Sequence, residues 1–239
     1  MVLMQHTQNP PKDSGYGYDD LRPFMSRMTG DEKHSEAATS TLDVVWTLYD
    51  RILNIDPADT SNPNRDRFLL SKGHGPMAFY SVLAAKGFID VGTLSTFGSF
   101  DSPLGHHPDH KLINGVEISS GSLGQGLALA VGVALGMEIK GHNGRVFCLM
   151  GDGELDEGSV HEAIAAASRL RVSRLTAIVI DNNSAQHGWP GQIGDRFAVE
   201  GWRSVDVDGR SHDDIERAIA TNHHDAPLVV VAKVGDRNA

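Results

Sequence analysis

Apolar residues form two kinds of pattern along the chain. Short apolar runs predict strands at 67–70, 146–150, 175–180 and 227–234, and we expect a further strand at 204–207. Helical spacing or helix-forming composition predicts helices at 37–53, 77–86, 92–97, 123–139, 157–170, 197–202 and 212–221. Strands that alternate with helices in this way are typical of an α/β fold. We therefore predict a doubly wound, mostly parallel sheet with helices on both faces.

The length of 239 residues suits one large domain, which we expect to span residues 31–239. Residues 1–30 mix Pro, Gly, Asp and Tyr without a sustained period. We expect a loosely ordered N-terminal arm there, with one short helical turn near 21–28. Such an arm either wraps a partner or is disordered.

The charge balance excludes several classes of function. The formal net charge is −10, and the sequence shows no basic patch, so we expect neither nucleic acid nor an anionic membrane as a partner. No run approaches 18 apolar residues and the N-terminus lacks an apolar signal core, so we expect a cytoplasmic protein. The single cysteine, Cys148, falls inside a predicted strand, which favours a buried structural thiol over a nucleophile.

The stretch 145–184 reads as strand, tight turn, helix, strand and polar turn. Parallel strands joined by a helix end at the same edge of a sheet, so Asp152 and Asn183 are expected side by side there. A carboxylate, an amide oxygen and the backbone carbonyl of Ala185 suit a hard divalent cation, and the glycines admit a diphosphate. Two ordinary turns are the simpler interpretation of either motif alone. Their pairing favours a metal–diphosphate site.

Several further motifs occur in a fixed order. They are RDRF followed by LSKGH (65–74), GHHPD (105–109), GSLGQG (121–126) and GDGELDEG (151–158). Together they resemble the N-terminal half of transketolase, and the GDG motif followed by Asn after about 30 residues resembles the fingerprint of thiamine diphosphate enzymes. The resemblance covers residues 28–234. It implies the thiamine-diphosphate-binding fold, with thiamine diphosphate and Mg²⁺ (or Ca²⁺) as cofactors.

The resemblance also implies half of a split enzyme. Transketolases carry a second, pyrimidine-binding domain that activates the cofactor, and the matched region of this chain contains only the first domain. We expect that second domain on a separate C-terminal-half subunit, in an α2β2 assembly. The reaction implied is the transfer of a two-carbon ketol unit from a ketose phosphate, with little catalysis by this chain alone.

The family's cofactor residues carry over position by position. As the resemblance implies, the metal ligands are Asp152, Asn183 and the carbonyl of Ala185. Gly153 matches the glycine that contacts the diphosphate, and His74 matches a histidine beside it. The residues that match those lining the thiazolium ring are Gly121 and Leu123.

The family's catalytic residues carry over in the same way. His74 matches a histidine near the reacting carbons, His107 one that faces the donor hydroxyl, and His34 the family's first histidine. Glu157 and Glu162 match carboxylates near the dimer contact, which in the family link two active sites by protons. Stabilisation of the helix dipole is an alternative role for both glutamates.

The chain departs from the family around the substrate channel. Lys33-His34-Ser35-Glu36 replaces a glycine-containing segment, and Lys233 stands where the family has a histidine. Cofactor use is therefore expected to be retained, while the donor and acceptor stay open. One alternative passes the two-carbon unit to a lipoyl or acyl-carrier thiol, as in dehydrogenase E1 components. Another is a non-catalytic domain that binds cofactor or a partner.

Overall fold

Five parallel strands form the centre of the molecule in the computed structural model, which describes residues 15–28, 39–185, 191–220 and 225–235. The strands are β1 (Arg67–Leu70), β2 (Val146–Gly151), β3 (Leu175–Asp181), β4 (Arg203–Asp208) and β5 (Leu228–Lys233). Their order across the sheet is β1-β2-β3-β5-β4, and every neighbouring pair is parallel. The predicted fold class and strands are confirmed.

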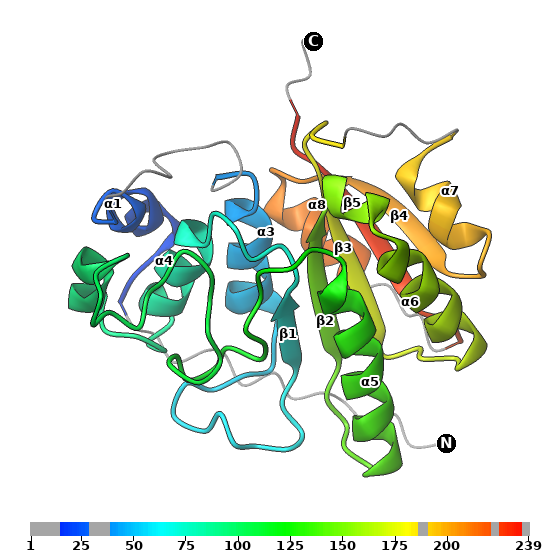
Figure 1. Cartoon of the computed structure of the whole chain (residues 1–239), viewed down its shortest axis with the longest axis horizontal. Helices are drawn as coiled ribbons and strands as arrows, with labels where there is room; N and C mark the ends of the chain where they lie inside the picture. The colour runs from blue at the N-terminus through cyan, green and yellow to red at the C-terminus, as the bar shows by residue number, and fades with distance from the viewer. Residues whose placement is uncertain (1–14, 29–38, 186–190, 221–224, 236–239) are drawn as a thin grey trace.

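Helices cover both faces of the sheet (Figure 1). One layer contains α1 (Leu21–Met25), α3 (Leu42–Thr47) with its π-helical continuation η2 (Leu48–Ile52), α4 (Met77–Ala85) and α8 (His212–Ala220). The other contains α5 (Gln125–Ile139), α6 (Gly158–Arg169) and α7 (Ile193–Ala198). The described residues also form the short 3-10 helices η1 (Tyr18–Asp20), η3 (Val91–Thr96) and η4 (Gly153–Asp156). None of the described helices is long and apolar enough to cross a membrane.

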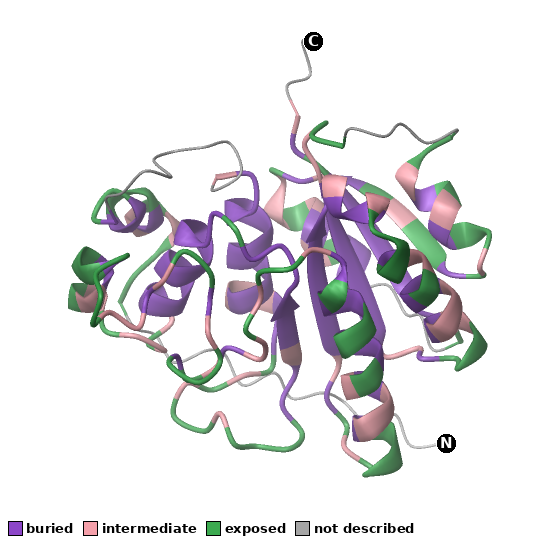
Figure 2. Cartoon of the chain, in the orientation of Figure 1, coloured by how far each residue is buried: buried purple, intermediate pink, exposed green. Residues whose placement is uncertain are grey.

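The apolar runs of β1, β2, β3 and β5 are continuous because these strands are buried, whereas β4 is mostly exposed (Figure 2). Alternate side chains of β2 enter opposite layers: Cys148 and Met150 pack toward α5 and α6, whereas Phe147 and Leu149 pack toward α3 and α4. All four are fully buried. The predicted buried thiol at Cys148 is therefore confirmed.

The described part of the predicted N-terminal arm packs onto the domain. Leu21, Phe24 and Met25 of α1 are buried in the same core as α4. The hydroxyl of Tyr18 donates a hydrogen bond to Asp43 in α3 at 2.5 Å. Residues 15–28 are thus ordered by apolar contacts that the irregular sequence pattern did not reveal. The predicted boundary near residue 30 lies outside the described residues and stays a prediction.

Two local predictions need correction. The helix expected at 197–202 begins earlier, at Ile193, because the Asp195 carboxylate accepts the backbone N–H of Gln192 and caps the helix start. It ends at Ala198, and Trp202 instead leads into β4. The second concerns residues 98–117, whose polar, histidine-containing composition predicts an exposed loop, yet the side chains of Leu104 and Ile113 are buried there.

Candidate functional site

A cavity of about 380 Å³ lies at the carboxyl edge of the sheet, beyond the ends of β1, β2 and β3. Open parallel sheets commonly bind ligands at this edge. Four turns line the cavity, with Lys72 and His74 following β1, Leu123 preceding α5, and Gly153 following β2. The fourth is the turn after β3. The structure thus brings three of the predicted cofactor residues, His74, Leu123 and Gly153, to one cavity.

The carboxylate of Asp152 is almost fully buried, at 2% exposure, beside this cavity. It accepts the backbone N–H groups of Gly153 at 2.8 Å, Ser184 at 2.7 Å and Ala185 at 3.2 Å. The Ser184 hydroxyl donates a further hydrogen bond to it. These contacts fix the anion and join the end of β2 to the loop after β3.

The two asparagines after β3 line different cavities. Asn182 lines the cavity beside Gly153, whereas Asn183 lines a larger one on the other side of β3. Asn183 has a φ of 59°, and its amide nitrogen would lie 2.6 Å from a Cβ placed on Gly235. The positive φ turns the chain between the two side chains. In this structure Asn183 thus lines the larger cavity, and its role as a metal ligand beside Asp152 stays a prediction.

The oxygen donors around Asp152 suit a hard cation. The Ser184 backbone oxygen lies 3.7 Å from a Cβ placed on Gly153, so this carbonyl borders the same space as Asn182. Carboxylate, amide and carbonyl oxygens are the ligands that Mg²⁺ and Ca²⁺ prefer. Among the described residues, no group of three or more His, Cys, Asp or Glu side chains could hold a metal. An ion here would therefore also need oxygens from a bound ligand.

Lys72 supplies a buried cation at the cavity. Its Cδ lies 3.4 Å from a Cβ placed on Gly151, and its Nζ lies 3.5 Å from the Ser40 hydroxyl. Burial lowers the pKa of Lys72 to about 8, and the charges of Asp152 and Glu154 oppose that shift. At neutral pH the ammonium is still protonated. The cavity therefore pairs oxygen donors for a metal with a positive charge for an anion.

Glu154 is the second buried carboxylate at the cavity, also at 2% exposure. It accepts hydrogen bonds from the Ser71 hydroxyl and from the backbone N–H of Gly124, the latter at 2.8 Å. Burial raises the pKa of Glu154, and the hydrogen bonds from Ser71 and Gly124 oppose that increase. Its contacts thus lie with the turn before α5.

His107 and Gly121 lie together outside the residues that line the cavity. The His107 ring is 3.8 Å from a Cβ placed on Gly121, so the two motif loops pack against each other. The Ser119 hydroxyl donates to Asp109 at 2.9 Å and ties the same loops together. The hydrogen bond between Ser119 and Asp109 is exposed, and so is the side chain of His107. The predicted roles of His107 and Gly121 stay predictions.

Two of the remaining catalytic candidates, Glu157 and Glu162, do not line the cavity. Glu157 is exposed and precedes α6, and a Cβ placed on Gly124 would lie 2.6 Å from its Cβ. Glu162 is exposed on the next turn of α6. His34 lies outside the described residues. No role of these three is tested by the fold.

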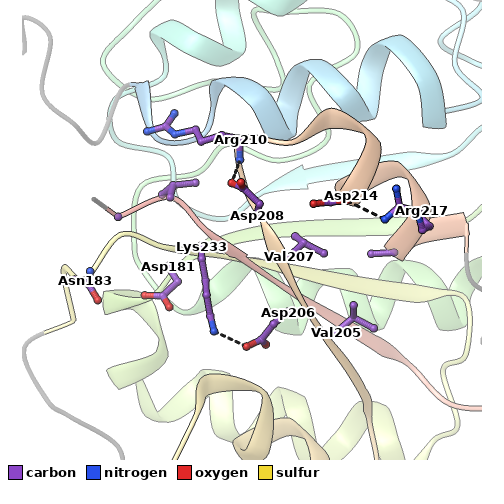
Figure 3. A pocket seen from close by; sticks show the side chains of 13 residues that line it. Asp181, Asn183, Val205, Asp206, Val207, Asp208, Arg210, Asp214, Arg217 and Lys233 are labelled. Carbon is purple, nitrogen blue, oxygen red and sulfur yellow. Dashed lines mark hydrogen bonds and ion pairs between the residues drawn. The ribbon is translucent and has the colours of Figure 1, made fainter. Parts of the chain in front are cut away.

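The larger cavity, of about 960 Å³, lies where β3, β5 and β4 end (Figure 3). Lys233 forms an ion pair with Asp206 at 2.6 Å, and this contact raises the pKa of Lys233. Burial raises the pKa of Asp181, which lines the same cavity. Lys233 therefore belongs to this cavity and not to the smaller one beside Asp152.

Several polar residues that line the smaller cavity were not among the candidates from the sequence, including Lys72, Glu154, Asn182 and Ser184. Each falls inside or beside a motif that was recognised. Their positions in LSKGH, in GDGELDEG and in the polar turn after β3 were the only sign in the sequence that they lie at the site. The side-chain directions that select them were not visible in the sequence.

A parallel α/β domain with a cation, a buried carboxylate and further oxygen donors at its carboxyl edge is typical of proteins that bind a phosphate-bearing cofactor there. Comparison with known families identifies the family. The profile "Transketolase, thiamine diphosphate binding domain" matches residues 28–234. The chain belongs to the transketolase family, and this region is its thiamine diphosphate-binding domain.

Two relatives are named as transketolase subunits. The 6-deoxy-6-sulfo-D-fructose transketolase subunit SqwG of Clostridium sp. is 34% identical over 78% of this chain and 70% of that protein. The apulose-4-phosphate transketolase subunit of Phocaeicola vulgatus is 35% identical over 77% of this chain and 67% of that protein. By contrast, the chain covers only 33% of Homo sapiens transketolase. The chain thus carries the thiamine diphosphate-binding domain of a transketolase-type transferase, and over most of its length it is similar to proteins named as transketolase subunits.

A third relative carries a different name. "Ferredoxin fas2" of Rhodococcoides fascians is 54% identical over 94% of this chain and 74% of that protein. Iron–sulfur clusters are held mainly by several cysteine thiolates, and this chain has one cysteine, which is buried. This chain therefore lacks the set of cysteine ligands that an iron–sulfur cluster needs, and the name ferredoxin is not carried over to it.

Solved structures agree on the fold. Transketolase from Campylobacter jejuni superposes with a TM-score of 0.73 at 24% identity, over 90% of this chain and 37% of that one. A transketolase mutant from Pichia stipitis superposes with a TM-score of 0.74, also at 24% identity. The chain thus has the fold of one domain of these larger enzymes.

Proposed function

We propose that this chain, together with a partner subunit, transfers a two-carbon ketol unit from a ketose phosphate to an aldose acceptor, using thiamine diphosphate and Mg²⁺. The observation that carries the proposal is that Asn182 and Lys72 line the same small cavity and that Asp152 lies beside it. It combines hard oxygen donors with a cation at the edge where this fold binds ligands.

The proposed metal ligands are the Asp152 carboxylate, the Asn182 amide oxygen and the Ser184 backbone oxygen. Placement of Asn183 in the other cavity and the position of the Ser184 carbonyl beside Gly153 support this set over Asn183 and Ala185. Diphosphate oxygens and water would complete an octahedral shell around Mg²⁺. The same oxygens suit Ca²⁺, which we keep as a substitute ion.

The cofactor's diphosphate is proposed to lie against Lys72 and His74. Leu123, beside Gly121, would face its ring. When bound, thiamine diphosphate supplies the electron sink that lets a carbon–carbon bond next to a carbonyl break. The chain's own part is to hold the cofactor and to place imidazoles near the substrate hydroxyls, because imidazole exchanges protons near neutral pH. We assign that part to His74, His107 and His34.

The partner is proposed to be a separate subunit that carries the pyrimidine-binding domain, in an α2β2 complex. The names of two relatives as transketolase subunits support a second subunit. The chain itself spans about a third of the length of Homo sapiens transketolase. Glu157 and Glu162 are proposed to lie near the contact between two copies of this chain, where their exposure leaves them available.

The substrate is proposed to be a ketose that carries an anionic group. One relative is named for a sulfonated fructose and another for a phosphorylated apulose, so both names describe sugars with an acidic substituent. The basic residues that read this group are expected mainly on the partner subunit. Which anionic ketose this chain serves is therefore decided by the complex.

Reconstitution tests the proposal. The chain and a candidate partner subunit with a pyrimidine-binding domain are purified and mixed with thiamine diphosphate, Mg²⁺, a ketose phosphate donor and ribose 5-phosphate. We expect a new ketose phosphate, detected by mass spectrometry, only when both chains, the cofactor and the metal are present. Acylation of a lipoyl or carrier thiol without a sugar product would contradict the sugar acceptor. Full turnover by this chain alone would contradict the need for a partner.

A further inference from the structure

The buried carboxylate of Glu154 joins three motif loops. Its Oε1 accepts hydrogen bonds from the Ser71 hydroxyl, at the end of β1, and from the Gly124 N–H, before α5. The Ser71 hydroxyl in turn accepts the N–H of Gly126 at 3.0 Å. Glu154 itself lies in η4, directly after Gly153. One side chain thus connects the turns that follow β1 and β2 with the start of α5.

The start of α5 depends on these outside acceptors. Its N-cap residue is Gly124, which has no side chain to cap the helix. The first N–H groups of a helix have no partner within the helix, and the aligned peptide dipoles favour a negative charge at that end. Glu154 and Ser71 satisfy two of these donors from a different part of the chain.

The turn before α5 is also held sterically. Gly124 has a φ of 81°, and its carbonyl accepts the Ser159 hydroxyl from α6 at 2.8 Å. A Cβ placed on Gly126 would lie 2.3 Å from the Cβ of Ser71. Leu123, which lines the small cavity, directly precedes Gly124. Its position at the cavity is therefore set by backbone contacts next to it.

We propose that Glu154 is a positioning residue for cofactor binding, which holds the Gly121–Gly124 turn in the place where the cofactor's ring meets it. This inference rests on the proposed function for the identity of the cofactor, but the contact to the turn is independent of it. Glu154 touches no reacting atom and acts through Gly124. Loss of the carboxylate should therefore loosen the turn and weaken cofactor binding without changing the chemical step.

Hydrogen exchange on the purified chain tests the positioning role. Glu154→Ala removes the oxygen that accepts the hydrogen bonds from Ser71 and Gly124. Glu154→Gln keeps one carbonyl oxygen in nearly the same place. We expect peptides covering 121–128 to exchange about tenfold faster in Glu154→Ala, with an intermediate rate in Glu154→Gln. Peptides covering β3 should be unchanged. Glu138→Ala, at the exposed far end of α5, is the matched control and should leave both regions unchanged.

Cofactor titration of the complex gives the second measurement. For Glu154→Ala we expect the thiamine diphosphate concentration at half-maximal activity to rise about tenfold, while kcat at saturating cofactor stays within about twofold of wild type. If Glu154→Ala does not fold, Ser71→Ala breaks the neighbouring link and should give the same pattern more weakly.

Three results would overturn the proposal. They are unchanged exchange in the turn, equal acceleration of exchange throughout the chain, and a fall in kcat with an unchanged cofactor requirement. A complex that turns over without any thiamine diphosphate would instead refute the proposed function. In that case the exchange of the turn would still decide whether Glu154 holds it.

Discussion

Ser184 donates two hydrogen bonds to the carboxylate of Asp152, one from its backbone N–H at 2.7 Å and one from its hydroxyl. The two residues are 32 positions apart and lie just after the ends of the neighbouring parallel strands β2 and β3. The loop after β3 is therefore organised around this buried anion. A metal that binds Asp152 would meet a ligand whose position is already fixed, which reduces the conformational cost of binding.

Replacement of Asp152 by Asn keeps the shape and removes the charge. The carboxamide places an NH₂ group among the N–H donors of Gly153, Ser184 and Ala185, so several charge-assisted bonds are lost. We expect the Mg²⁺ and thiamine diphosphate requirements of the complex to rise about 100-fold or more, measured by calorimetry and activity titration. Asp181→Asn, at the end of β3 in the other cavity, should change them less than about threefold.

Equal losses in the Asp152 and Asp181 variants would contradict the metal assignment. Such a result would mean that the whole carboxyl edge responds to charge rather than one ligand position. A stability measurement on both variants separates this outcome from simple unfolding. Asp152→Asn is expected to lower the melting temperature as well, because Asp152 is buried and hydrogen-bonded.

The two asparagines after β3 offer a matched pair. Asn182→Ala removes the amide at the small cavity and should raise the half-saturating Mg²⁺ concentration about tenfold. Asn183→Gly should leave it unchanged, and it should not destabilise the fold, because glycine readily adopts the φ of 59° found there. The opposite ranking in a magnesium titration would restore Asn183 as the ligand.

This pair also shows how far the sequence could be read. The apolar runs located β1, β2, β3 and β5, because strands buried on both faces need continuous apolar residues. The mostly exposed strand β4 has no such run. The turn after β3 was correctly located as well. The choice between Asn182 and Asn183 depends on one backbone torsion, the positive φ of Asn183, and a polar turn in a sequence does not reveal which residue adopts it.

The burial of charged residues was equally hidden. Lys72 and Glu154 are 5% and 2% exposed, although residues of these types usually lie at the surface. Their burial follows from contacts with loops far along the chain, such as that of Glu154 with Gly124. The N-terminal segment gives a similar lesson, since Leu21 and Phe24 find their core partners in α4. Local pattern predicts elements better than it predicts such long-range contacts.

The charge of Lys72 can be removed with little change in side-chain shape. Lys72→Met should weaken thiamine diphosphate binding by the complex about tenfold, because an ammonium at the cavity is lost. The stability of the chain should be unchanged or higher, since burial of the charge is costly, as its lowered pKa indicates. Lys233→Met is the control and should leave cofactor binding unchanged, because Lys233 pairs with Asp206 in the other cavity. A larger loss in Lys233→Met would instead assign the diphosphate to that cavity.

Cys148 is expected to be chemically silent. It is fully buried in β2, and burial raises the pKa of its thiol well above the ordinary value of 9.0. A raised pKa leaves less thiolate at pH 8 than a free cysteine has, and the thiolate is the reactive form. Mass spectrometry should therefore show that iodoacetamide at pH 8 leaves the native chain unmodified, yet alkylates it fully in guanidinium chloride.

Cys148→Ala should retain the activity of the complex, with a modest loss of stability from the smaller side chain. Rapid labelling of the native chain, together with inactivation, would revive the nucleophile that the sequence alone left as an alternative.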